Sequence, residues 1–518
     1  MIRTSCVVIL VAGLLTPQPA GARSCSVVDF GAVADGRTLC TVAIQRAVDA
    51  CAAAVGGDVV FPAGRYCSGP VFLKSHVHVR INAGAVVLAD TSIESCPPFQ
   101  GRWEGIEQKV YASLFSGSGL THVSITGRGI LDGRGEVWWK AHHRTREMRR
   151  RAGITGREPA NPPGSPLKWP RPRMINLYDC TNVLIRDLTF LDSPSWTIHP
   201  VYCRNVTVDN VTIIQPYESP NTDGINPESC RDVRIVNCYV DCGDDCVTIK
   251  SGYNEDGRRV NIPCQNIVVA NCTFARGRSA VGIGSETSGG VFNVAISNCV
   301  FKETLRGLRI KSARGRGNAV ENIRASNIVM QDVGTGISLD MFYGGDDETS
   351  RPVDETTPHF RNIRYSNITG TGLKKAGEIY GLPEAPMQGV VLHDIYLEGE
   401  TGLEVKFVKE AAFHDMEINA AEGAALSIRA SVDVELDNVG SRKPVHGQPV
   451  IALTNVQRAL LRNFRAAPGV DLFLRVAGPE SAEILLADRW LDATGRRVEL
   501  TRNAPDDAVI LLDADPWR

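Results

Sequence analysis

The sequence lacks an excess of either charge and, beyond its first residues, any long hydrophobic run. Its 56 Lys and Arg residues face 58 Asp and Glu residues, so the net charge is −2. This balance excludes a general electrostatic attraction to nucleic acid, and no later segment is apolar enough for a transmembrane helix. We therefore expect neither nucleic acid nor a membrane as a partner. A hydrophobic content of 43% argues against a disordered chain.

The sequence also has no Cys-x-x-Cys pair and no convincing spacing of metal ligands, so we predict no metal and no cofactor. After Cys6, all cysteines fall between Cys25 and Cys299. An oxidising compartment permits disulfides, but spacing alone does not give their pairing. Three cysteines follow an Asn at equivalent repeat positions, which favours stacked core side chains. These are Cys238, Cys272 and Cys299.

The N-terminus has the pattern of a secretory signal peptide over residues 1–22. Arg3 supplies the positive charge, Cys6–Leu15 is apolar, and Ala20-Gly21-Ala22 fits a cleavage site. The apolar part is too short to span a bilayer as a helix. The pattern predicts a secreted or periplasmic protein, and a buried N-terminal strand is the alternative.

A repeat of 20 residues recurs in four windows, each with Asn at position 5 and an apolar residue at position 17. Each window holds two short strands with alternating apolar residues. Short strands at regular spacing, with an Asn stacked on the next Asn, predict an all-β solenoid of parallel sheets, a parallel β-helix. The windows are Val233–Gly252, Ile267–Glu286, Val294–Ala313 and Ile323–Phe342, and the Asn residues are Asn237, Asn271, Asn298 and Asn327.

One such β-helix domain is predicted for residues 23–518. The stretch Thr41 to Ala52 fits an N-terminal capping helix, because its apolar residues fall on one helical face. These are Ile44, Ala47, Val48 and Cys51. The segment from about 468 to 518 is less periodic, and we expect it to hold the last coils or a C-terminal cap.

Residues 137–173 interrupt the repeats with a basic insertion. Between positions 140 and 173, ten Lys and Arg residues face Glu147 and Glu158. Such a segment is either a solvated loop or helix, or an electrostatic funnel for a polyanion. In the second case Trp138 and Trp139 would offer stacking faces for sugars. The cations are Lys140, Arg144, Arg146, Arg149, Arg150, Arg151, Arg157, Lys168, Arg171 and Arg173.

Three aspartates have the arrangement expected of a catalytic site. When the coils are aligned on their inward apolar residues, Asp223 and Asp245 fall at the same level of adjacent coils, about 5 Å apart. Asp244 shares this site only if the chain bends, which Gly243 permits. The aligned inward residues are Ile198, Ile225, Val247, Val281 and Leu308.

Clustered carboxylates repel one another, so at least one of the three should keep its proton near neutral pH. Asp223 and Asp245 would then activate a water, and Asp244 would protonate the leaving oxygen of a glycosidic bond. A water between base and acid predicts inversion, with a separation of roughly 6.5–9.5 Å. Aspartates that cap strands or bind Ca²⁺ are the alternative.

Cations follow on the same face of the repeat. Arg309 and Lys311 point outward, and Lys250 is their counterpart two coils earlier. Gly282 and Gly284 lie between them and leave space for a ligand. A cleft floored by glycine and flanked by cations suits a uronate carboxylate, whereas surface ion pairs are the alternative.

Four short motifs occur in a fixed order: Asn221-Thr222-Asp223-Gly224, Gly243-Asp244-Asp245-Cys246, Gly284-Ser285-Glu286 and Arg309-Ile310-Lys311. With the opening Asp29-Phe30-Gly31-Ala32, they resemble glycoside hydrolase family 28, the polygalacturonases and related pectin hydrolases. The resemblance covers nearly the whole chain after residue 22. It implies a single-stranded right-handed parallel β-helix that hydrolyses α-linked galacturonate with inversion. The implied substrate is an acidic plant polysaccharide or oligogalacturonide.

The resemblance also implies a role for each matching residue. Asp244 would be the general acid, and Asp223 and Asp245 would activate water. Arg309 and Lys311 would bind substrate together with Asn221, and Tyr343 looks like the family's tyrosine on the substrate side.

One motif departs from the family pattern. Gly277-Arg278-Ser279 stands where the family usually has Gly-His-Gly. Arg278 falls level with Asp244, one coil on, where it would bind an anion or depress the pKa of Asp244. We interpret the Arg as a subgroup feature, because exo-acting and plant-like members also lack this His.

Two further residues, Trp196 and His199, lie one coil before Asp223 and Asn226 in the same alignment. There they would either line a sugar subsite or pack in the core. The stretch Trp196–Pro200 and the long loop before Arg278 look like those of exo-acting members, in which long loops close one end of the groove.

Three other functions stay open on the sequence alone. The first is a glycosidase of rhamnogalacturonan or another decorated pectin, which Arg278 and the basic insertion would favour. The second is a β-helix polysaccharide lyase, whose chemistry needs Ca²⁺ or an Arg or Lys base. The third is a glycan-binding β-helix without catalysis. The sequence leaves the oligomeric state unknown.

Overall fold

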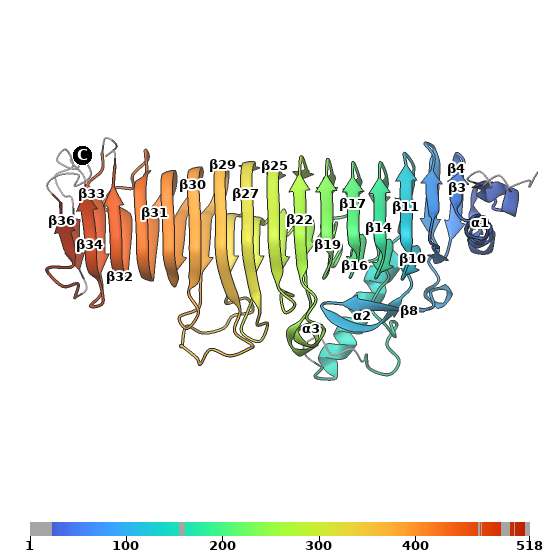
Figure 1. Ribbon diagram of the computed structural model, residues 1–518, viewed down its shortest axis with the longest axis horizontal. Helices are drawn as coiled ribbons and strands as arrows, with labels where there is room; N and C mark the ends of the chain where they lie inside the picture. Colours follow the sequence, from blue (N-terminus) through green and yellow to red (C-terminus); the bar gives the residue numbers. More distant parts are fainter. Residues whose placement is uncertain are drawn as a thin grey trace, which may run out of the picture.

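The chain winds as a single-stranded right-handed parallel β-helix, with helix α1 (Thr41–Ala53) at one end of the stack and strand β36 (Val509–Leu511) at the other (Figure 1). The computed structural model describes residues 23–154, 161–464, 467, 469–487, 498–501 and 503–512. The predicted signal peptide, residues 1–22, lies outside the described residues. Within the described part of the chain, no helix combines the length and apolarity needed to cross a bilayer.

Each coil contributes strands to stacks in which neighbours pair in parallel. The first stack is β1 (Arg23–Ser26), β3 (Gly57–Phe61), β6 (Val77–Ile81), β11 (Thr121–Gly127), β14 (Thr181–Arg186), β17 (Arg204–Asp209), β19 (Arg231–Val236), β22 (Cys264–Ala270), β25 (Val291–Lys302), β27 (Ala319–Gln331), β29 (His359–Tyr380), β30 (Met387–Lys406), β31 (Val408–Gly440), β32 (Pro449–Arg462), β34 (Ala482–Ala487) and β36.

The second stack is β2 (Asp35–Leu39), β4 (Gly64–Ser68), β7 (Ala85–Ala89), β12 (Ile130–Asp132), β15 (Thr189–Leu191), β18 (Thr212–Ile214), β20 (Tyr239–Asp241) and β23 (Thr273–Phe274), which joins β25. The third stack is β5 (Val71–Phe72), β10 (Phe115–Ser118), β13 (Ile175–Tyr178), β16 (Ile198–Val201), β21 (Val247–Ile249), β24 (Val281–Gly284), β26 (Arg306–Lys311) and β28 (Thr335–Asp340), which joins β29. Strands β33 (Leu472–Ala477) and β35 (Val498–Thr501) continue from β32. The third stack carries the candidate site.

The predicted Asn ladder is present at the turn between the first two stacks. The amide of Asn271 donates to Asn237 at 3.4 Å, that of Asn298 to Asn271 at 3.4 Å, and that of Asn327 to Asn298 at 3.0 Å. All four residues are in the left-handed region, with φ of 55° to 58°, which Asn tolerates better than most side chains. A second ladder that the sequence analysis missed runs through Asn266, Asn293, Asn322 and Asn362.

Stacked apolar side chains fill the interior of the coils. All 14 cysteines from Cys25 to Cys299 are buried and form no disulfide, and the backbone amide of Cys238 lies 3.4 Å from the sulfur of Cys272. The three cysteines that follow ladder Asn residues are therefore core residues, as expected. Helix α1 closes the N-terminal end of this core with the predicted face of Ile44, Ala47, Val48 and Cys51, joined by Ala43.

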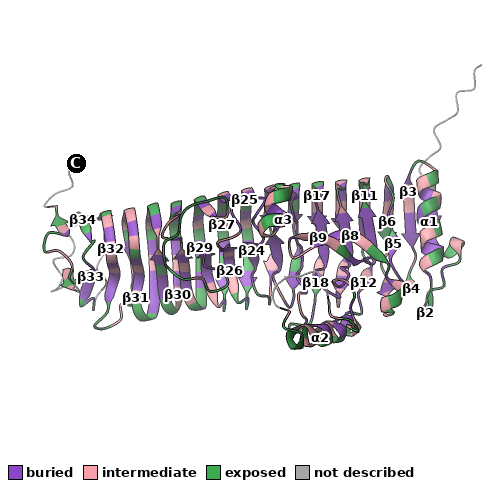
Figure 2. Cartoon of the chain, turned by 90° about the horizontal axis from the view of Figure 1, so that it is seen from below, coloured by how far each residue is buried: buried purple, intermediate pink, exposed green. Residues whose placement is uncertain are grey.

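Two features stand out from the coils beside the third stack (Figures 1 and 2). An antiparallel hairpin is formed by β8 (Pro98–Trp103) and β9 (Ile106–Tyr111). The predicted basic insertion begins with helix α2 (Glu136–Arg151). A shorter helix, α3 (Asn254–Val260), lies next to β9, and the short 3-10 helices η1 (Val27–Phe30) and η2 (Ile93–Ser95) complete the elements.

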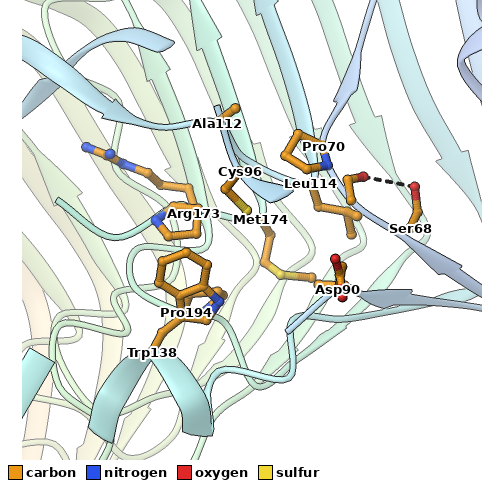
Figure 3. A pocket seen from close by; sticks show the side chains of 13 residues that line it. Ser68, Pro70, Asp90, Cys96, Ala112, Leu114, Trp138, Arg173, Met174 and Pro194 are labelled. Atoms are coloured by element: carbon orange, nitrogen blue, oxygen red, sulfur yellow. Dashed lines mark hydrogen bonds between the residues drawn. The ribbon is translucent and has the colours of Figure 1, made fainter. Parts of the chain in front are cut away.

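The sugar-stacking role that the funnel alternative gave to Trp138 is wrong. This side chain is 1% exposed and packs with Cys96, Tyr111, Ala141 and Leu167 in a small core of its own. Figure 3 shows it at the edge of a void of about 20 Å³, which is room for roughly one water and far too little for a sugar. Trp139 is half-buried, and its ring nitrogen donates to the carbonyl of Ser193 at 3.0 Å.

The alternative of an electrostatic funnel is wrong for much of the set of ten cations. Arg171 and Arg173 are each 1% exposed and donate to backbone carbonyls. Lys140 pairs with Glu136, and Arg150 and Arg151 pair with Glu147; Arg157 lies outside the described residues. The remaining cations are Arg144, Arg146, Arg149 and Lys168.

Candidate active site

The register of the third stack places the three aspartates. Bridges join Ile198 to Ile225 and Ile225 to Val247, and paired strands continue to Val281 and Leu308. This is the predicted alignment of inward residues, and it puts Asp223 level with Asp245 on the adjacent coil. One carboxylate oxygen from each of Asp223, Asp244 and Asp245 lies within 4.8 Å of one from each of the others.

Gly243 lets the two aspartate loops approach. A Cβ at this position would lie 2.3 Å from the carbonyl oxygen of Ser219, so any other residue would force the loops apart. The amide of Gly243 instead donates to the hydroxyl of Thr222 at 3.2 Å. Because the chain bends here rather than running as a strand, the consecutive Asp244 and Asp245 share one site.

The expected separation of 6.5–9.5 Å between acid and base is not met, because the nearest oxygens lie within 4.8 Å. Asp223 and Asp245 occupy neighbouring rungs, which are about 4.8 Å apart, and Asp244 directly precedes Asp245. All three therefore rise from one wall of the groove. Taken alone, the distance falls nearer the roughly 5–5.5 Å of retaining glycosidases.

The three carboxyl groups differ in charge because their neighbours differ. Burial raises the pKa of Asp244 to about 8, and the charges of Asp223 and Asp245 add to this effect. Burial also opposes the charge of Asp245, but Lys311 and Arg309 outweigh it and lower the pKa of Asp245 to about 2. Burial raises the pKa of Asp223 above its usual value despite Lys250. At neutral pH the cluster thus holds a protonated Asp244 beside an ionised Asp245.

Asp223 and Asp245 each keep one oxygen without a hydrogen-bond partner among the described residues. These are the two Oδ1 atoms, both of them buried. The other oxygens are occupied, since Asn226 donates to Asp223 at 3.0 Å and Lys311 donates to Asp245 at 2.8 Å. Buried acceptors normally find a donor, so each of these two oxygens keeps an unused acceptor position.

The predicted cations lie at the carboxylates. Lys311 Nζ is 2.8 Å from Asp245, and Lys250 Nζ is 3.6 Å from Asp223. The ring centre of Tyr343 is 5.5 Å from the guanidinium carbon of Arg309 and 5.6 Å from Lys311 Nζ. Half-exposed Arg309 and exposed Tyr343 are therefore the parts of this group open to a ligand.

The two glycines of the floor act differently. A Cβ at Gly282 would lie 3.6 Å from Asp245, so this residue does keep space over the carboxylate. At Gly284 a Cβ would lie 2.1 Å from the carbonyl oxygen of Lys311, and φ is +89°. That glycine is needed by the backbone rather than by a ligand.

Trp196 and His199 are buried beneath the site. Trp196 is 2% exposed, with Trp103 of the hairpin stacked on it at 4.7 Å and Lys250 Nζ 3.9 Å from its ring centre. His199 is fully buried and bonded to Glu228 at 3.0 Å, and burial lowers its pKa to about 4. Both residues contact the layer that holds Lys250 and present almost no surface to a ligand.

Arg278 and Asn221 lie on two sides of the cluster. Arg278 has 62% of its side chain exposed, and its Nε is 3.7 Å from Asp244. Asn221 accepts a hydrogen bond of 2.7 Å from Arg171, which also donates to the carbonyls of Pro194 and Pro220. Arg171 thus fastens the loop that carries Asp223.

Sequence reasoning missed the contributions of Trp103, Glu228 and the fastening role of Arg171. Trp103 comes from a hairpin roughly 90 residues upstream of Trp196 in the sequence, and no repeat places it there. Buried Glu228 pairs with buried Arg102 of the same hairpin at 3.2 Å. Only a complete account of buried charges would have pointed to such pairs.

The three aspartates also offer the donor set of a cation site. Lys250 and Lys311 already stand against two of them, and their charges oppose a divalent cation. The arrangement is better suited to proton transfer, with one acid and one base, than to holding a metal.

The sequence is similar to those of known glycoside hydrolases. The sequence model of glycosyl hydrolases family 28 matches residues 164–414. A probable polygalacturonase from Vitis vinifera is 35% identical over 384 residues, which cover 72% of this chain and 74% of that protein. An exopolygalacturonase clone from Arabidopsis thaliana is 28% identical, covering 73% and 80%.

Solved structures show the same fold. The crystal structure of a hyperthermoactive exopolygalacturonase from Thermotoga maritima is 32% identical, with a TM-score of 0.65, and covers 74% of this chain and 90% of that one. The family 28 exopolygalacturonase of Yersinia enterocolitica, at 22% identity and a TM-score of 0.65, is similar in fold.

Proposed function

Because the chain belongs to glycosyl hydrolases family 28, we propose that it hydrolyses α-linked galacturonate in pectin, acting from chain ends, as a secreted or periplasmic enzyme. The observation that carries this proposal is the cluster of three carboxyl groups within 4.8 Å of one another, in which Lys311 lies 2.8 Å from Asp245 while burial raises the pKa of Asp244. A glycosidase needs one acid and one base at the scissile bond.

In the proposed mechanism, a water held by the free oxygens of Asp223 and Asp245 attacks the anomeric carbon of galacturonate. The aspartate pair takes the proton of that water, and Asp244 gives its proton to the leaving glycosidic oxygen. The bond from carbon to the leaving oxygen breaks as the bond to water forms, so the product has inverted configuration. Direct attack by water gives this inversion, whereas the short separation taken alone would suggest retention.

The cations have separate proposed roles. Arg309 binds the sugar carboxylate together with Tyr343, and Arg278 contributes a second positive contact from the rim. Lys311 contacts both the substrate carboxylate and Asp245, whereas Lys250 balances the negative charge of Asp223. Asn221 lies at the edge of the substrate groove. Trp196 packs against Lys250, and His199 bonds to Glu228, so both residues position the groove from its buried side.

Action at chain ends is supported by the likeness to exopolygalacturonases and by the hairpin β8–β9 and helix α2, which stand out from the coils (Figure 2). Trp103 of the hairpin is stacked on Trp196. The direct test is release of reducing ends from polygalacturonate and from rhamnogalacturonan, with the products sized. Galacturonate monomer from polygalacturonate is expected. Release only from rhamnogalacturonan would transfer the assignment to a decorated-pectin glycosidase, and no release from either would overturn it.

The pH dependence of kcat should follow the proton of Asp244. This residue must be protonated to act as the acid, so kcat is expected to fall as the pH rises through about 8. On the acid side kcat should fall as Asp223 takes up a proton. Because the pKa of Asp223 is raised, this fall is expected at a higher pH than for an ordinary aspartate.

Arg278→Ala should move the basic limb of this profile to higher pH. Burial sets the raised pKa of Asp244, and the charge of Arg278 opposes it. Because Arg278 is 62% exposed, solvent and salt screen its charge, and we expect a shift of less than about one pH unit. Arg276→Ala is the matched control, since Arg276 pairs with Asp241 instead. A basic limb that stays in place in Arg278→Ala, or moves equally in both variants, would contradict this role.

A further inference from the structure

The long loop between β28 and β29, residues 341–358, stands out from the coils on the same side as helix α3 (Figure 1). A connection of this length without a helix or strand is uncommon in a compact fold, and an ordered one is mostly functional. Near its start the loop carries Tyr343, whose ring centre lies 5.5 Å from the guanidinium carbon of Arg309 and 5.6 Å from Lys311 Nζ. The contacts that fix this loop therefore bear on how Tyr343 is held at the candidate site.

Arg314 fastens the loop to the coils. It lies three residues after Lys311, on the connection between β26 and β27. Its guanidinium donates to the carbonyl oxygens of Asp347 at 2.9 Å and of Thr349 at 3.0 Å. The same group lies 3.1 Å from the carboxylate of Asp346. One side chain, from the coil that carries the substrate-binding cations, thus holds the loop at three points.

Glu384 fixes Arg314 in turn. Its two carboxylate oxygens accept hydrogen bonds of 2.6 and 2.9 Å from the guanidinium. Paired bonds between Arg and a carboxylate fix geometry as well as charge, and Lys does not reproduce them. Glu384 belongs to the connection between β29 and β30. Arg314 therefore joins the loop 341–358 to the connections of the preceding and the following coil.

The hydrogen-bonding groups of Arg314 are directed to the protein rather than to a ligand. The side chain is 9% exposed, and its Nε and both Nη atoms have acceptors. Arg309 differs, because it is half-exposed and its Nε has no acceptor among the described residues. Arg314 is thus suited to holding the structure, whereas Arg309 stays available to a substrate.

Tyr343 is held between two fixed points. On one side, its backbone amide donates to the carbonyl oxygen of Ser312 at 3.0 Å. On the other side follow Gly344 and Gly345, which have φ of 101° and 88° and no other atom within 4 Å of a Cβ position. Two such glycines neither pack nor stiffen the backbone. The next side chain along the loop is the aspartate that Arg314 binds, so this contact limits the movement of Tyr343.

A second anchor lies further along the loop and does not involve Arg314. Glu348 accepts hydrogen bonds from Lys406 at 2.6 Å and from Arg429 at 2.8 Å. These two cations belong to β30 and β31, on later coils. Loss of Arg314 should therefore loosen the start of the loop, where Tyr343 lies, while the rest of the loop stays attached.

We propose that Arg314 is a positioning residue of the enzyme, which holds Tyr343 beside Arg309 and Lys311 through the loop 341–358 and does not itself touch the substrate. This inference rests on the proposed function, in which Tyr343 and the cations bind the uronate. A loosened loop would leave Tyr343 in several positions, and substrate binding would then have to order it at a cost in conformational entropy. Ordering by Arg314 strengthens binding of the uronate without changing the chemistry at the aspartates.

The test is a double-mutant cycle of Arg314→Ala and Tyr343→Ala on polygalacturonate. We expect Arg314→Ala to raise KM by roughly fivefold, the effect of losing about one hydrogen bond, and to leave kcat within about twofold of the wild type. In the Tyr343→Ala background the same change should add little, because Arg314 acts through Tyr343. Arg314→Lys, which keeps the charge without the paired bonds, should recover part of the loss.

Arg351→Ala is the matched control. Arg351 also pairs with Asp346, but its side chain is 45% exposed, and such exposed pairs contribute little. Its replacement should leave KM within about twofold of the wild type. Because Arg314→Ala leaves the nearly buried Glu384 without its cation, the cycle is repeated with Glu384→Gln added, and the same rise in KM is expected. An unchanged KM, or an equal loss with and without Tyr343, would overturn the proposal.

A failure of the hydrolase assignment is recognised separately, because the wild-type protein would then release no product from polygalacturonate. Hydrogen exchange followed by mass spectrometry still tests the contacts of Arg314 in that case, since it reports local opening of the backbone. Faster exchange over residues 341–347 in Arg314→Ala but not in Arg351→Ala supports the positioning role, and unchanged exchange contradicts it.

Discussion

Replacing Asp244 with Asn is expected to lower kcat on polygalacturonate by roughly 10²–10⁴-fold, the usual contribution of a general acid. Asn is close in shape to Asp but cannot give a proton to the leaving oxygen. The fold should survive, because Asn replaces a half-buried carboxyl group whose ionised form is repelled by the charges of Asp223 and Asp245. Steady-state kinetics together with thermal unfolding measures the two effects, and we expect a Tm no lower than that of the wild type.

Asp241→Asn is the matched control for this variant. Asp241 lies three residues earlier and pairs with Arg276 at 2.7 Å, outside the cluster. Its replacement should leave kcat within a few-fold of the wild type. Turnover of Asp244→Asn that equals turnover of this control would remove Asp244 from the mechanism and with it the proposed assignment of acid and base.

Lys311→Ala is expected to affect both stability and binding. The pair of Lys311 and Asp245 is nearly buried, with side chains 10% and 3% exposed. Removing the cation leaves a buried carboxylate without its main partner, which costs about 3–5 kcal/mol in the free energy of unfolding near neutral pH. The loss should shrink as the pH falls, because without Lys311 the folded state holds the proton of Asp245 more tightly than the unfolded state does.

Urea denaturation at neutral and acidic pH measures this loss, and KM for a uronate substrate should rise as well. Lys302→Ala is the control, since Lys302 forms an exposed pair with Glu303 that is worth at most about 1 kcal/mol. Asp245→Asn added to Lys311→Ala should restore much of the stability. If Lys311→Ala is as stable as Lys302→Ala, the buried pair of Lys311 and Asp245 does not stabilise the fold as proposed. If the KM of Lys311→Ala for a uronate substrate is unchanged, Lys311 does not bind the substrate carboxylate.

Much of the fold and of the candidate site was predictable because a β-helix repeats its register at every coil. One inward residue per coil, from Ile198 to Leu308, was enough to align Asp223 with Asp245 and Arg278 with Asp244. The same regularity gave the Asn ladder, whose members stack at fixed positions. When successive coils have the same spacing, residues at equivalent positions of the repeat are neighbours in space.

The parts that departed from prediction lie where the chain leaves the coils. The hairpin that stacks Trp103 on Trp196 and the helix that buries Trp138 follow no repeat. Composition alone therefore left open whether the insertion is a solvated segment or an exposed basic funnel. Its Arg171 is instead buried and bonded to Asn221. The separation of the carboxylates was also misjudged, because it was taken from glycosidases whose acid and base face each other across the sugar, whereas here they share one wall.

The central claim is that water, held by Asp223 and Asp245, displaces the glycosidic oxygen in one step while Asp244 protonates it. Proton NMR of the first products from polygalacturonate tests this most directly, because it shows the anomer before mutarotation and any unsaturation in the sugar. We predict saturated galacturonate that appears first as the β-anomer. A first product that is the α-anomer would establish retention through a covalent intermediate, and an unsaturated product would establish a lyase; either result would contradict the account.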